Sequence, residues 1–478
     1  MTNSLFAKAN TTDPKIDAYF DQQVMRKYNT AGPRYTSYPT AVAFTELDTA
    51  EPHQDIIIDK ALSQLSCSKD AQRLSLYMHV PFCHSLCYYC GCNKIVTRHA
   101  HKADIYLDYL IKEIQARGPA AKGCKVDSLH LGGGTPSFLN IAQLKRLLDA
   151  CKKAFEFADK VEMSIEIDPR EIELNYMDGL AKLGFSRLSI GVQDIDAKVQ
   201  QSINRTQSTA FIRALIRRAR QVGFKSVNLD LIYGLPHQTE CSFQHTLEEM
   251  QIMRPDRISL FSYAHMPQLF AAQRKIKDEW LPNAANKFAL FRQAVAFLTQ
   301  IGYDAVGMDH FALPSDELSI AKREDRLFRN FQGYTTSAAH ATLGLGVSSI
   351  SSINDVYVQN QKDLKAYYQQ MDEVSHAQSK GLVMSKDDLI RRALIHGLMC
   401  NFHINKATFS NAYDIDFDRY FEKSLSNLTT FIDDKLVTNS DEAITIHDRG
   451  RLIVRNICMS FDEYLDKPLH QMRYSRVI

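Results

Sequence analysis

The sequence lacks the features of a membrane or exported protein. No apolar run approaches the roughly 20 residues that a membrane-spanning helix needs. Residues 1–20 are polar and charged, without the apolar core of a signal peptide. The formal net charge is only +2, from 57 basic and 55 acidic residues, which gives no reason to expect a nucleic-acid partner. We therefore expect a cytoplasmic protein with neither a membrane nor a nucleic-acid partner.

The chain also lacks internal repeats and low-complexity tracts, and its composition is that of a globular protein. Apolar residues make up 45% and charged residues 23% of the 478 residues. This length exceeds what one ordinary core accommodates, so we expect more than one domain. We predict an N-terminal arm over residues 1–44, a large α/β domain over 45–375 and a smaller α-rich domain over 376–478.

Six short runs rich in Val, Ile and Leu alternate with longer stretches of helical periodicity. Each run has the length of a strand, and Ile141, Leu144, Leu147 and Leu148 illustrate the helical spacing between runs. Such alternation predicts βαβ units and a parallel sheet. The predicted fold class is therefore α/β, a partial (β/α)6 barrel with two units fewer than the eight-fold barrel. The predicted strands are residues 74–80, 126–131, 161–167, 187–193, 226–232 and 257–263.

Candidate functional residues follow five of these predicted strands. A cysteine-rich loop, residues 83–92, follows the first strand, and a glycine-rich turn, residues 132–136, follows the second. Glu166, Gln193 and Asp230 lie at or near the ends of the next three. Because the chemistry of parallel barrels lies at the C-terminal ends of the strands, we expect all five features to share one site.

The cysteine loop has the spacing C-x3-C-x2-C-x-C over Cys83, Cys87, Cys90 and Cys92. Without an export signal, we do not expect a disulfide framework. Thiolates are the usual ligands of iron–sulfur clusters, and we expect Cys83, Cys87 and Cys90 to bind three irons and leave one open. A structural zinc site is the alternative, but it usually needs a distant second Cys or His pair, which is not evident here. Cys92 is either a fourth ligand, a residue facing the substrate or a buried thiol.

Three further features admit both a functional and a structural interpretation. The glycines at 132–134 would let the backbone approach a ligand closely, but they also suit a tight turn. Glu166 could accept hydrogen bonds from ribose hydroxyls or be a solvated carboxylate. His79 lies between apolar neighbours, four residues before Cys83, and is either a core residue or a functional one.

Residues 77–95, Tyr-Met-His-Val-Pro-Phe-Cys-His-Ser-Leu-Cys-Tyr-Tyr-Cys-Gly-Cys-Asn-Lys-Ile, resemble the signature of the oxygen-independent coproporphyrinogen III oxidases. These enzymes, also called coproporphyrinogen III dehydrogenases, belong to the radical S-adenosylmethionine (SAM) superfamily. The resemblance runs from about residue 25 to the C-terminus. The other segments that carry it are Arg34–Thr40, Gly191–Asp194, Asp230–Pro236, Gly307–Ala312 and Arg329–Thr335.

The resemblance implies a partial barrel of the radical SAM type and an oxidoreductase of haem biosynthesis. The family converts two propionate side chains of coproporphyrinogen III into vinyl groups, releasing CO2 and making protoporphyrinogen IX without oxygen. A 5′-deoxyadenosyl radical, generated from SAM at a [4Fe–4S] cluster, abstracts hydrogen from the propionate. An electron donor such as a flavodoxin-like or ferredoxin-like protein is also implied, and we expect a monomer.

The resemblance also assigns roles to individual residues. Cys83, Cys87 and Cys90 would hold the cluster, and His79 and Cys92 are candidate catalytic residues. The family binds two SAM molecules. The cluster-bound SAM would contact Tyr77, Gly133, Glu166 and Ile350. The second SAM would contact Tyr89, Gly134, Thr135, Gln193, Arg205, Asp230 and Ala264.

The strongest alternative is the related haem chaperone, a binding protein that shares the barrel and the three cysteines. Those chaperones typically have Asp-Phe after the third cysteine and lack the Arg34–Thr40 segment, whereas this chain has Gly91-Cys92 and contains the segment. The sequence therefore favours the enzyme. Another radical SAM enzyme that acts on a different tetrapyrrole is a third alternative. One position departs from the family, since a polar residue is expected at Phe328.

Overall fold

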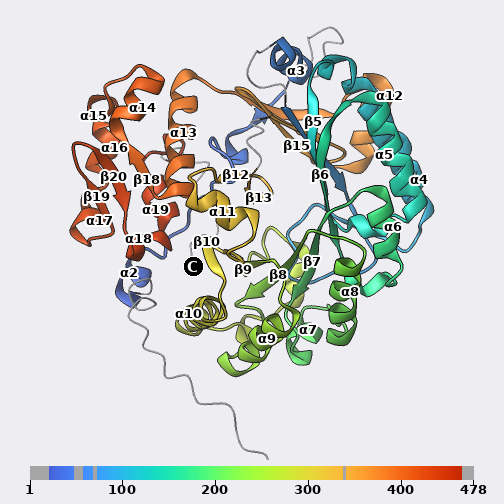
Figure 1. Ribbon diagram of the computed structural model, residues 1–478, viewed down its shortest axis with the longest axis horizontal. Helices are drawn as coiled ribbons and strands as arrows, with labels where there is room; N and C mark the ends of the chain where they lie inside the picture. The colour runs from blue at the N-terminus through green and yellow to red at the C-terminus, as the bar shows by residue number, and fades with distance from the viewer. Residues whose placement is uncertain (1–20, 48–56, 68–72, 337–340, 466–478) are drawn as a thin grey trace, which may run out of the picture.

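The computed structural model describes residues 21–47, 57–67, 73–336 and 341–465. Its largest feature is a curved 13-stranded sheet with parallel strands at its centre (Figure 1). Six parallel strands follow one another in space in the order of the sequence. They are β2 (Arg73–Val80), β5 (Lys125–Gly133), β6 (Glu156–Ile167), β7 (Arg187–Gln193), β8 (Ser226–Tyr233) and β9 (Arg257–Ser262). All six predicted strands are therefore confirmed, with small shifts at their ends.

Helices connect these strands and cover the outer face of the sheet (Figure 1). They are α4 (His101–Arg117), α5 (Ile141–Ala154), α6 (Tyr176–Leu183), α7 (Ala197–Ser202), α8 (Thr209–Gln221), α9 (Glu240–Met253) and α10 (Ala284–Gln300). In α5 the buried residues are Leu144, Leu147, Leu148 and Cys151, which form one apolar stripe at helical spacing. The predicted partial (β/α)6 barrel is confirmed.

The sheet stays open and extends beyond the barrel at both ends, which the sequence did not predict. β14 runs parallel to β2, and the strands beyond it are antiparallel. One extension contains β14 (Thr342–Leu345), β15 (Ile350–Ile353), β16 (Val356–Asn360), β17 (Gln378–Val383) and β1 (Thr45–Glu46). The other contains β11 (His310–Ala312) and β10 (Asp304–Gly307). β17 lies beyond residue 375 yet pairs with β16, and the division into domains remains a prediction.

Shorter elements complete the described chain. A two-stranded sheet contains β12 (Phe328–Asn330) and β13 (Gly333–Thr335), and a second one contains β3 (Phe82–Cys83) and β4 (Ile95–Val96). Additional helices are α2 (Gln22–Lys27), α3 (Ile57–Cys67), α11 (Glu317–Arg323) and α12 (Leu364–Glu373). None of the helices in the described part of the chain is long and apolar enough to cross a membrane.

The C-terminal unit is rich in helices, as the sequence predicts. A three-stranded sheet in the order β18-β20-β19 packs among them. Its strands are β18 (His403–Asn405), β19 (Val437–Asn439) and β20 (Ala443–Ile446). Its helices are α13 (Lys386–Asn401), α14 (Lys406–Tyr413), α15 (Phe417–Tyr420), α16 (Glu422–Ser426), α17 (Thr429–Asp433), α18 (Asp448–Arg451) and α19 (Val454–Met459).

The described part of the N-terminal arm, residues 21–44, packs into the core of this C-terminal unit. Val24, Met25, Tyr28, Tyr35 and Tyr38 are buried together with residues from α13 to α19. The Tyr28 ring stacks on a phenylalanine of α17 at 4.7 Å between centroids. Its hydroxyl donates to an aspartate just after that helix at 2.6 Å. Figure 1 shows α2 next to the C-terminal unit, although the two are at opposite ends of the sequence.

Parallel pairing brings the candidate functional residues to one edge of the sheet. His79 on β2 pairs with Gly132 on β5, and Gly191 on β7 pairs with Asp230 on β8. Glu166 is the second-last residue of β6 and pairs with β7. Since these strands all run in one direction, the loops after them lie at the same edge of the sheet.

We predict that Phe421→Ala destabilises the C-terminal unit by about 3–5 kcal/mol, because it leaves a cavity in a closely packed core. Phe421 is 1% exposed and contacts the rings of Phe417 and Phe461 at 5.0 and 5.7 Å. Urea unfolding followed by circular dichroism measures the change. Ile252→Ala is the control, because Ile252 is 61% exposed. Equal unfolding midpoints for the two variants would contradict the assignment of this core.

Candidate functional site

Two short strands close the base of the cysteine loop. β3 pairs with β4 in parallel, so that Phe82 faces Ile95 and Cys83 faces Val96. The backbone of Thr97 donates to the Cys83 carbonyl at 2.9 Å. The intervening residues form a loop directly after β2, in which Cys87 and Cys90 lie close enough to Cys83 for their charges to act on it. The side chains of Cys83 and Cys87 are buried, Cys90 is half-buried and Cys92 is exposed.

Hydrogen-bond donors and positive charges surround these sulfurs. The Thr135 hydroxyl donates to Cys83 Sγ at 3.3 Å, and Arg170 and Arg205 each donate to Cys87 Sγ at 3.4 Å. A hydrogen bond from Cys92, together with the nearby Lys94 charge, lowers the pKa of Cys90 to about 6, although burial opposes this shift. Burial raises the pKa of Cys83 to about 11, although the Thr135 hydrogen bond opposes this shift. The surroundings therefore favour the thiolate at Cys90, whereas at Cys83 the donor from Thr135 stabilises the thiolate against burial.

This donor set fits an iron–sulfur cluster. Three cysteines from one loop present soft ligands, and the groups that donate to their sulfurs would stabilise an anionic cluster. Within the described ranges, no three His, Cys, Asp or Glu side chains converge closely enough to hold a single ion. Ligands of a cubane each bind a different iron, so their sulfurs need not converge on one point.

The glycine turn after β5 packs against the strand that carries the cysteine loop. A Cβ at Gly133, where φ is +117°, would lie 2.6 Å from the His79 ring. A Cβ at Gly134 would lie 2.6 Å from the Pro81 carbonyl oxygen, and the Gly134 N–H donates to Val80 at 2.8 Å. Glycine is therefore required for close approach between these two chain segments, whether or not a ligand is bound.

A hydrogen-bonded group of side chains lies beside this turn. The Gly133 N–H donates to Glu166 Oε2 at 3.2 Å, and His130 Nε2 donates to Glu166 Oε1 at 3.3 Å. His79 Nε2 donates to the Asn93 carbonyl at 3.0 Å, so its Nδ1 accepts from the Tyr77 hydroxyl at 3.1 Å. Burial lowers the pKa of His79, which keeps its ring neutral. Both ring nitrogens therefore have partners.

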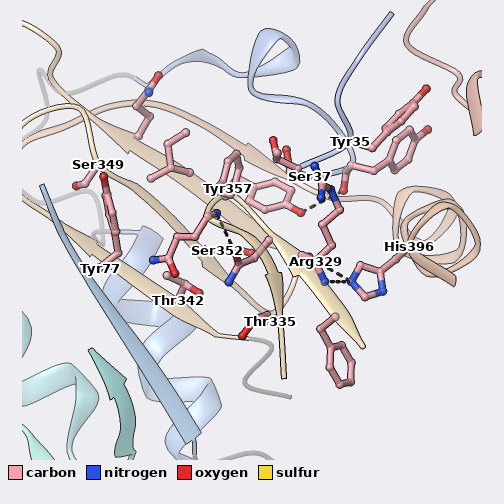
Figure 2. Close-up of a pocket in the computed structure, with 18 of the residues that line it drawn as sticks. Tyr35, Ser37, Tyr77, Arg329, Thr335, Thr342, Ser349, Ser352, Tyr357 and His396 are labelled. Atoms are coloured by element: carbon pink, nitrogen blue, oxygen red, sulfur yellow. Dashed lines mark hydrogen bonds between the residues drawn. The ribbon is translucent and has the colours of Figure 1, made fainter. Parts of the chain in front are cut away.

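A cavity of about 1130 Å³ opens beside this group (Figure 2). Its walls come from the cysteine loop, the N-terminal arm, β12, β14 to β16 and α13. It divides the predicted site residues into two sets. Those that line it are Tyr77, His79, Cys92, Gly133, Glu166 and Ile350. Those outside its lining are Cys83, Cys87, Cys90, Tyr89, Gly134, Thr135, Gln193, Arg205, Asp230 and Ala264.

The residues predicted to contact a second SAM are thus separate from the cavity, but several are connected to one another. Gln273 Nε2 donates to the carbonyls of Tyr89 and Ala264, at 2.9 and 3.2 Å. A Cβ at Gly191 would lie 2.9 Å from the side-chain nitrogens of both Gln193 and Arg205. The Arg205 guanidinium already has protein partners. It forms an ion pair with Asp168, which follows β6, at 3.0 Å and donates to the Gly191 carbonyl at 2.6 Å.

Asp230 is a buried carboxylate on β8. It accepts hydrogen bonds from Asn228 at 2.8 Å and from Ser189 at 3.2 Å. Burial, together with the negative charge of Glu166, raises the pKa of Asp230 to about 6. Asp230 therefore lies within electrostatic reach of Glu166, although β7 separates their two strands in the sheet.

Sequence reasoning missed several residues of this site. His130 lies on β5 two positions before Gly132, and the period-2 alternation of a strand places both on the same face. Asp168 and Arg170 follow the third predicted strand, and their ion pair of 2.5 Å lies next to Cys87. Alternation could have indicated His130, whereas the pairing of Asp168 with Arg205 depends on the tertiary fold.

Comparison with known proteins shows which families this chain resembles. Residues 77–250 match the model of the Radical SAM superfamily, and residues 384–453 match that of the HemN C-terminal domain. The oxygen-independent coproporphyrinogen III oxidase of Escherichia coli is 50% identical over 96% of this chain and 98% of its own. The protein of that name from Pseudomonas aeruginosa is 42% identical, over 96% and 99%.

A solved structure is similar over nearly the whole chain. It is coproporphyrinogen III oxidase from Escherichia coli, described as a radical SAM enzyme. The two chains superpose with a TM-score of 0.88 and are 49% identical, and the match covers 93% of this chain and 99% of that one.

We predict that Asp230→Asn changes how stability depends on pH. The folded state raises the pKa of Asp230 from 3.8 to about 6, so folding favours the protonated form. The wild type should lose stability relative to the variant as pH rises from about 4 to about 7, by up to roughly 3 kcal/mol. Urea unfolding over this range measures the difference. Asp149→Asn, at an exposed ion pair, should show no such trend, and a flat difference for Asp230→Asn would contradict the prediction.

Proposed function

The chain belongs to the family of oxygen-independent coproporphyrinogen III oxidases, and we propose that it converts two propionates of coproporphyrinogen III into vinyl groups. The product is protoporphyrinogen IX, an intermediate of haem biosynthesis. The observation that carries the proposal is the cavity of about 1130 Å³ beside the cysteine loop. This volume is at the upper end of ordinary ligand pockets, roughly 300–1,000 Å³, so the cavity is large enough for a tetrapyrrole. Since the similar proteins are named oxidases, the enzyme is favoured over the haem chaperone.

A [4Fe–4S] cluster and SAM are the cofactors of this superfamily. Cys83, Cys87 and Cys90 would hold the cluster, and Arg170, Arg205 and Thr135 would donate to its cysteine sulfurs. When bound, these cofactors supply a carbon radical that can remove a hydrogen atom from a propionate side chain. The protein residues bind and orient both partners and exclude water from the radical.

The residues at the cysteine-loop end of the cavity would bind SAM and the reacting propionate. Tyr77, Gly133, Glu166 and Ile350 form that wall, where Glu166 can accept hydrogen bonds from hydroxyl groups. His79 is neutral and fixed by two hydrogen bonds, so it would position Tyr77 and the cysteine loop. Cys92 is exposed on the same wall and stays available to the substrate.

A second SAM would bind outside this cavity. Tyr89, Gly134, Thr135, Gln193, Arg205, Asp230 and Ala264 would contact it. Support comes from the buried carboxylate of Asp230, whose pKa is raised to about 6 by burial and by the charge of Glu166, so that its charged form is disfavoured. A cationic ligand beside Asp230 would stabilise that charged form, and the sulfonium and ammonium groups of SAM are cations.

The arm, residues 1–44, and the C-terminal domain, residues 376–478, would close the open side of the barrel domain, residues 45–375. Tyr35, Ser37 and Tyr38 from the arm already line the cavity. The enzyme would act as a cytoplasmic monomer, and a flavodoxin-like or ferredoxin-like protein would supply electrons. It would have neither a nucleic-acid nor a membrane partner.

Anaerobic turnover tests this function. Incubation with coproporphyrinogen III, SAM and a reductant should give protoporphyrinogen IX, identified by mass. Cys83→Ala, Cys87→Ala and Cys90→Ala should each abolish iron binding and turnover, because each change removes a cluster ligand. Cys92→Ser is the matched control within the loop and should keep near-normal iron. Stoichiometric haem binding without turnover would refute the enzyme, and iron loss in Cys92→Ser equal to that in Cys83→Ala would refute the three-ligand set.

SAM stoichiometry tests the second binding site. Equilibrium binding to the cluster-loaded protein should reveal two sites, and Arg205→Ala should leave one. The variant should fold, because Asp168 keeps its ion pair with Arg170. Arg146→Ala, which removes a surface ion pair with Asp108, should retain both sites. Two sites in Arg205→Ala would show that this residue does not bind SAM.

A further inference from the structure

Charge is unevenly distributed around the cavity. Among the described residues, its lining contains the cations Arg329, Arg392 and Lys362 but only one carboxylate, Glu166. Glu166 lies at the cysteine-loop end, whereas Arg329 and Arg392 come from β12 and α13. Figure 2 shows Tyr77 at one side of the view and Arg329 with His396 at the other. The two arginines therefore lie away from the cysteine loop, whereas the carbonyl of Lys362 accepts a hydrogen bond from Asn93, which directly follows Cys92, at 3.0 Å.

Arg329 is held in place without the use of its side-chain hydrogen-bond donors. Its guanidinium stacks on the Tyr334 ring at 4.6 Å from the centroid, and the Tyr334 hydroxyl is anchored to the Met399 carbonyl at 3.0 Å. The Arg329 backbone N–H donates to His396 Nε2 at 2.8 Å. Stacking fixes the plane of the guanidinium while leaving its in-plane N–H groups for another partner.

Those N–H groups lack a partner in the described part of the chain. Arg329 is 9% exposed, and its Nε and Nη1 atoms are buried without a hydrogen bond. A buried guanidinium with unsatisfied donors is costly unless a ligand or water binds it. Arg392, by comparison, already donates to the Asn354 carbonyl at 3.0 Å.

Asp309 balances part of the Arg329 charge without accepting a hydrogen bond from it. Burial would raise the pKa of Asp309, yet the charges of His310, Arg329 and Arg34 hold it below its usual value. The Asp309 carboxylate instead pairs with His310 Nδ1 at 2.8 Å. Arg329 thus has a counter-charge nearby but retains its capacity to form a bidentate pair.

We propose that Arg329 binds a carboxylate of the substrate that is not decarboxylated, and so positions the tetrapyrrole. The proposal rests on the proposed function, because coproporphyrinogen III carries propionates that the reaction leaves intact. A guanidinium forms two parallel hydrogen bonds with a carboxylate. With one propionate on Arg329, the ring system would lie against Phe328, Phe331 and Tyr357, which also line the cavity. A reacting propionate would then face Tyr77 and Glu166.

Phe328 acquires a role in this arrangement. The resemblance predicted a polar residue there, but the side chain lines the cavity and lies 5.7 Å from the His396 ring, between ring centroids. An apolar face beside Arg329 suits the hydrocarbon part of a propionate and excludes water from the ion pair. Arg329 would therefore be a substrate-positioning residue rather than a catalytic one.

Steady-state kinetics of the cluster-loaded enzyme tests this role. Arg329→Gln should raise KM for coproporphyrinogen III about 10- to 100-fold, the effect of losing a charged hydrogen-bonded pair, while kcat changes less than about threefold. Arg329→Lys keeps the charge but not the planar fork, so its KM should lie between those of Arg329→Gln and the wild type. Arg392→Gln removes a cavity charge that is already bonded and is the matched control, with a smaller rise in KM.

A substrate analogue identifies the group that Arg329 binds. When a propionate that is normally retained is replaced by an ethyl group, KM of the wild type should rise as much as in Arg329→Gln. The analogue should cause no further rise in Arg329→Gln, because the interaction is already absent. Three outcomes would overturn the proposal. The analogue could raise KM equally in the wild type and in Arg329→Gln, or Arg329→Gln could leave KM for the substrate unchanged. The wild type could also bind each ethyl analogue with full affinity, and this result is conclusive even if the variant does not fold.

The same assays separate this proposal from the function on which it rests. A wild type that does not convert coproporphyrinogen III refutes the function itself. A wild type that converts it, accompanied by an Arg329→Gln variant with unchanged KM, refutes only the carboxylate subsite.

Discussion

The site depends on the close contact between the glycine turn after β5 and the end of β2. Because Gly133 and Gly134 have no Cβ, the turn reaches the His79 ring and the Pro81 carbonyl. That contact brings the cysteine loop next to Glu166, which accepts from the Gly133 backbone. A larger side chain at either glycine would separate the two loops. It would also move Glu166, which is hydrogen-bonded to Gly133, away from His79 and Tyr77, with which it lines the cavity.

Electrostatics distinguish the two ends of the site. Around the cysteine sulfurs, Arg170 and Arg205 share Asp168, which fixes both side chains and leaves a net positive charge. At the far end of the cavity, Arg329 has only an indirect counter-charge in Asp309. Fixed cations suit a permanent anionic group, whereas an arginine with free donors suits an anion that enters and leaves. The same residue type therefore serves two different purposes in one protein.

Much of this arrangement could be predicted from the sequence, because its causes are local. Val/Ile/Leu runs and helical spacing identified all six barrel strands, and cysteine spacing identified the loop after the first. The extension from β14 to β17 was missed, because these strands are short and their partners lie far along the chain. The sequence also did not predict which site residues line the cavity and which do not. The resemblance assigns each residue a contact but does not say where its side chain lies relative to the cavity.

The N-terminal arm has a consequence for biosynthesis. Tyr28 and Tyr35 are synthesised before the partners between residues 430 and 462 against which they pack. The barrel strands are complete by residue 262, and domains fold as units during translation. One wall of the cavity therefore cannot form until residues 430–462 have been synthesised. During that interval the cavity lacks this wall, and docking of the described part of the arm then completes it.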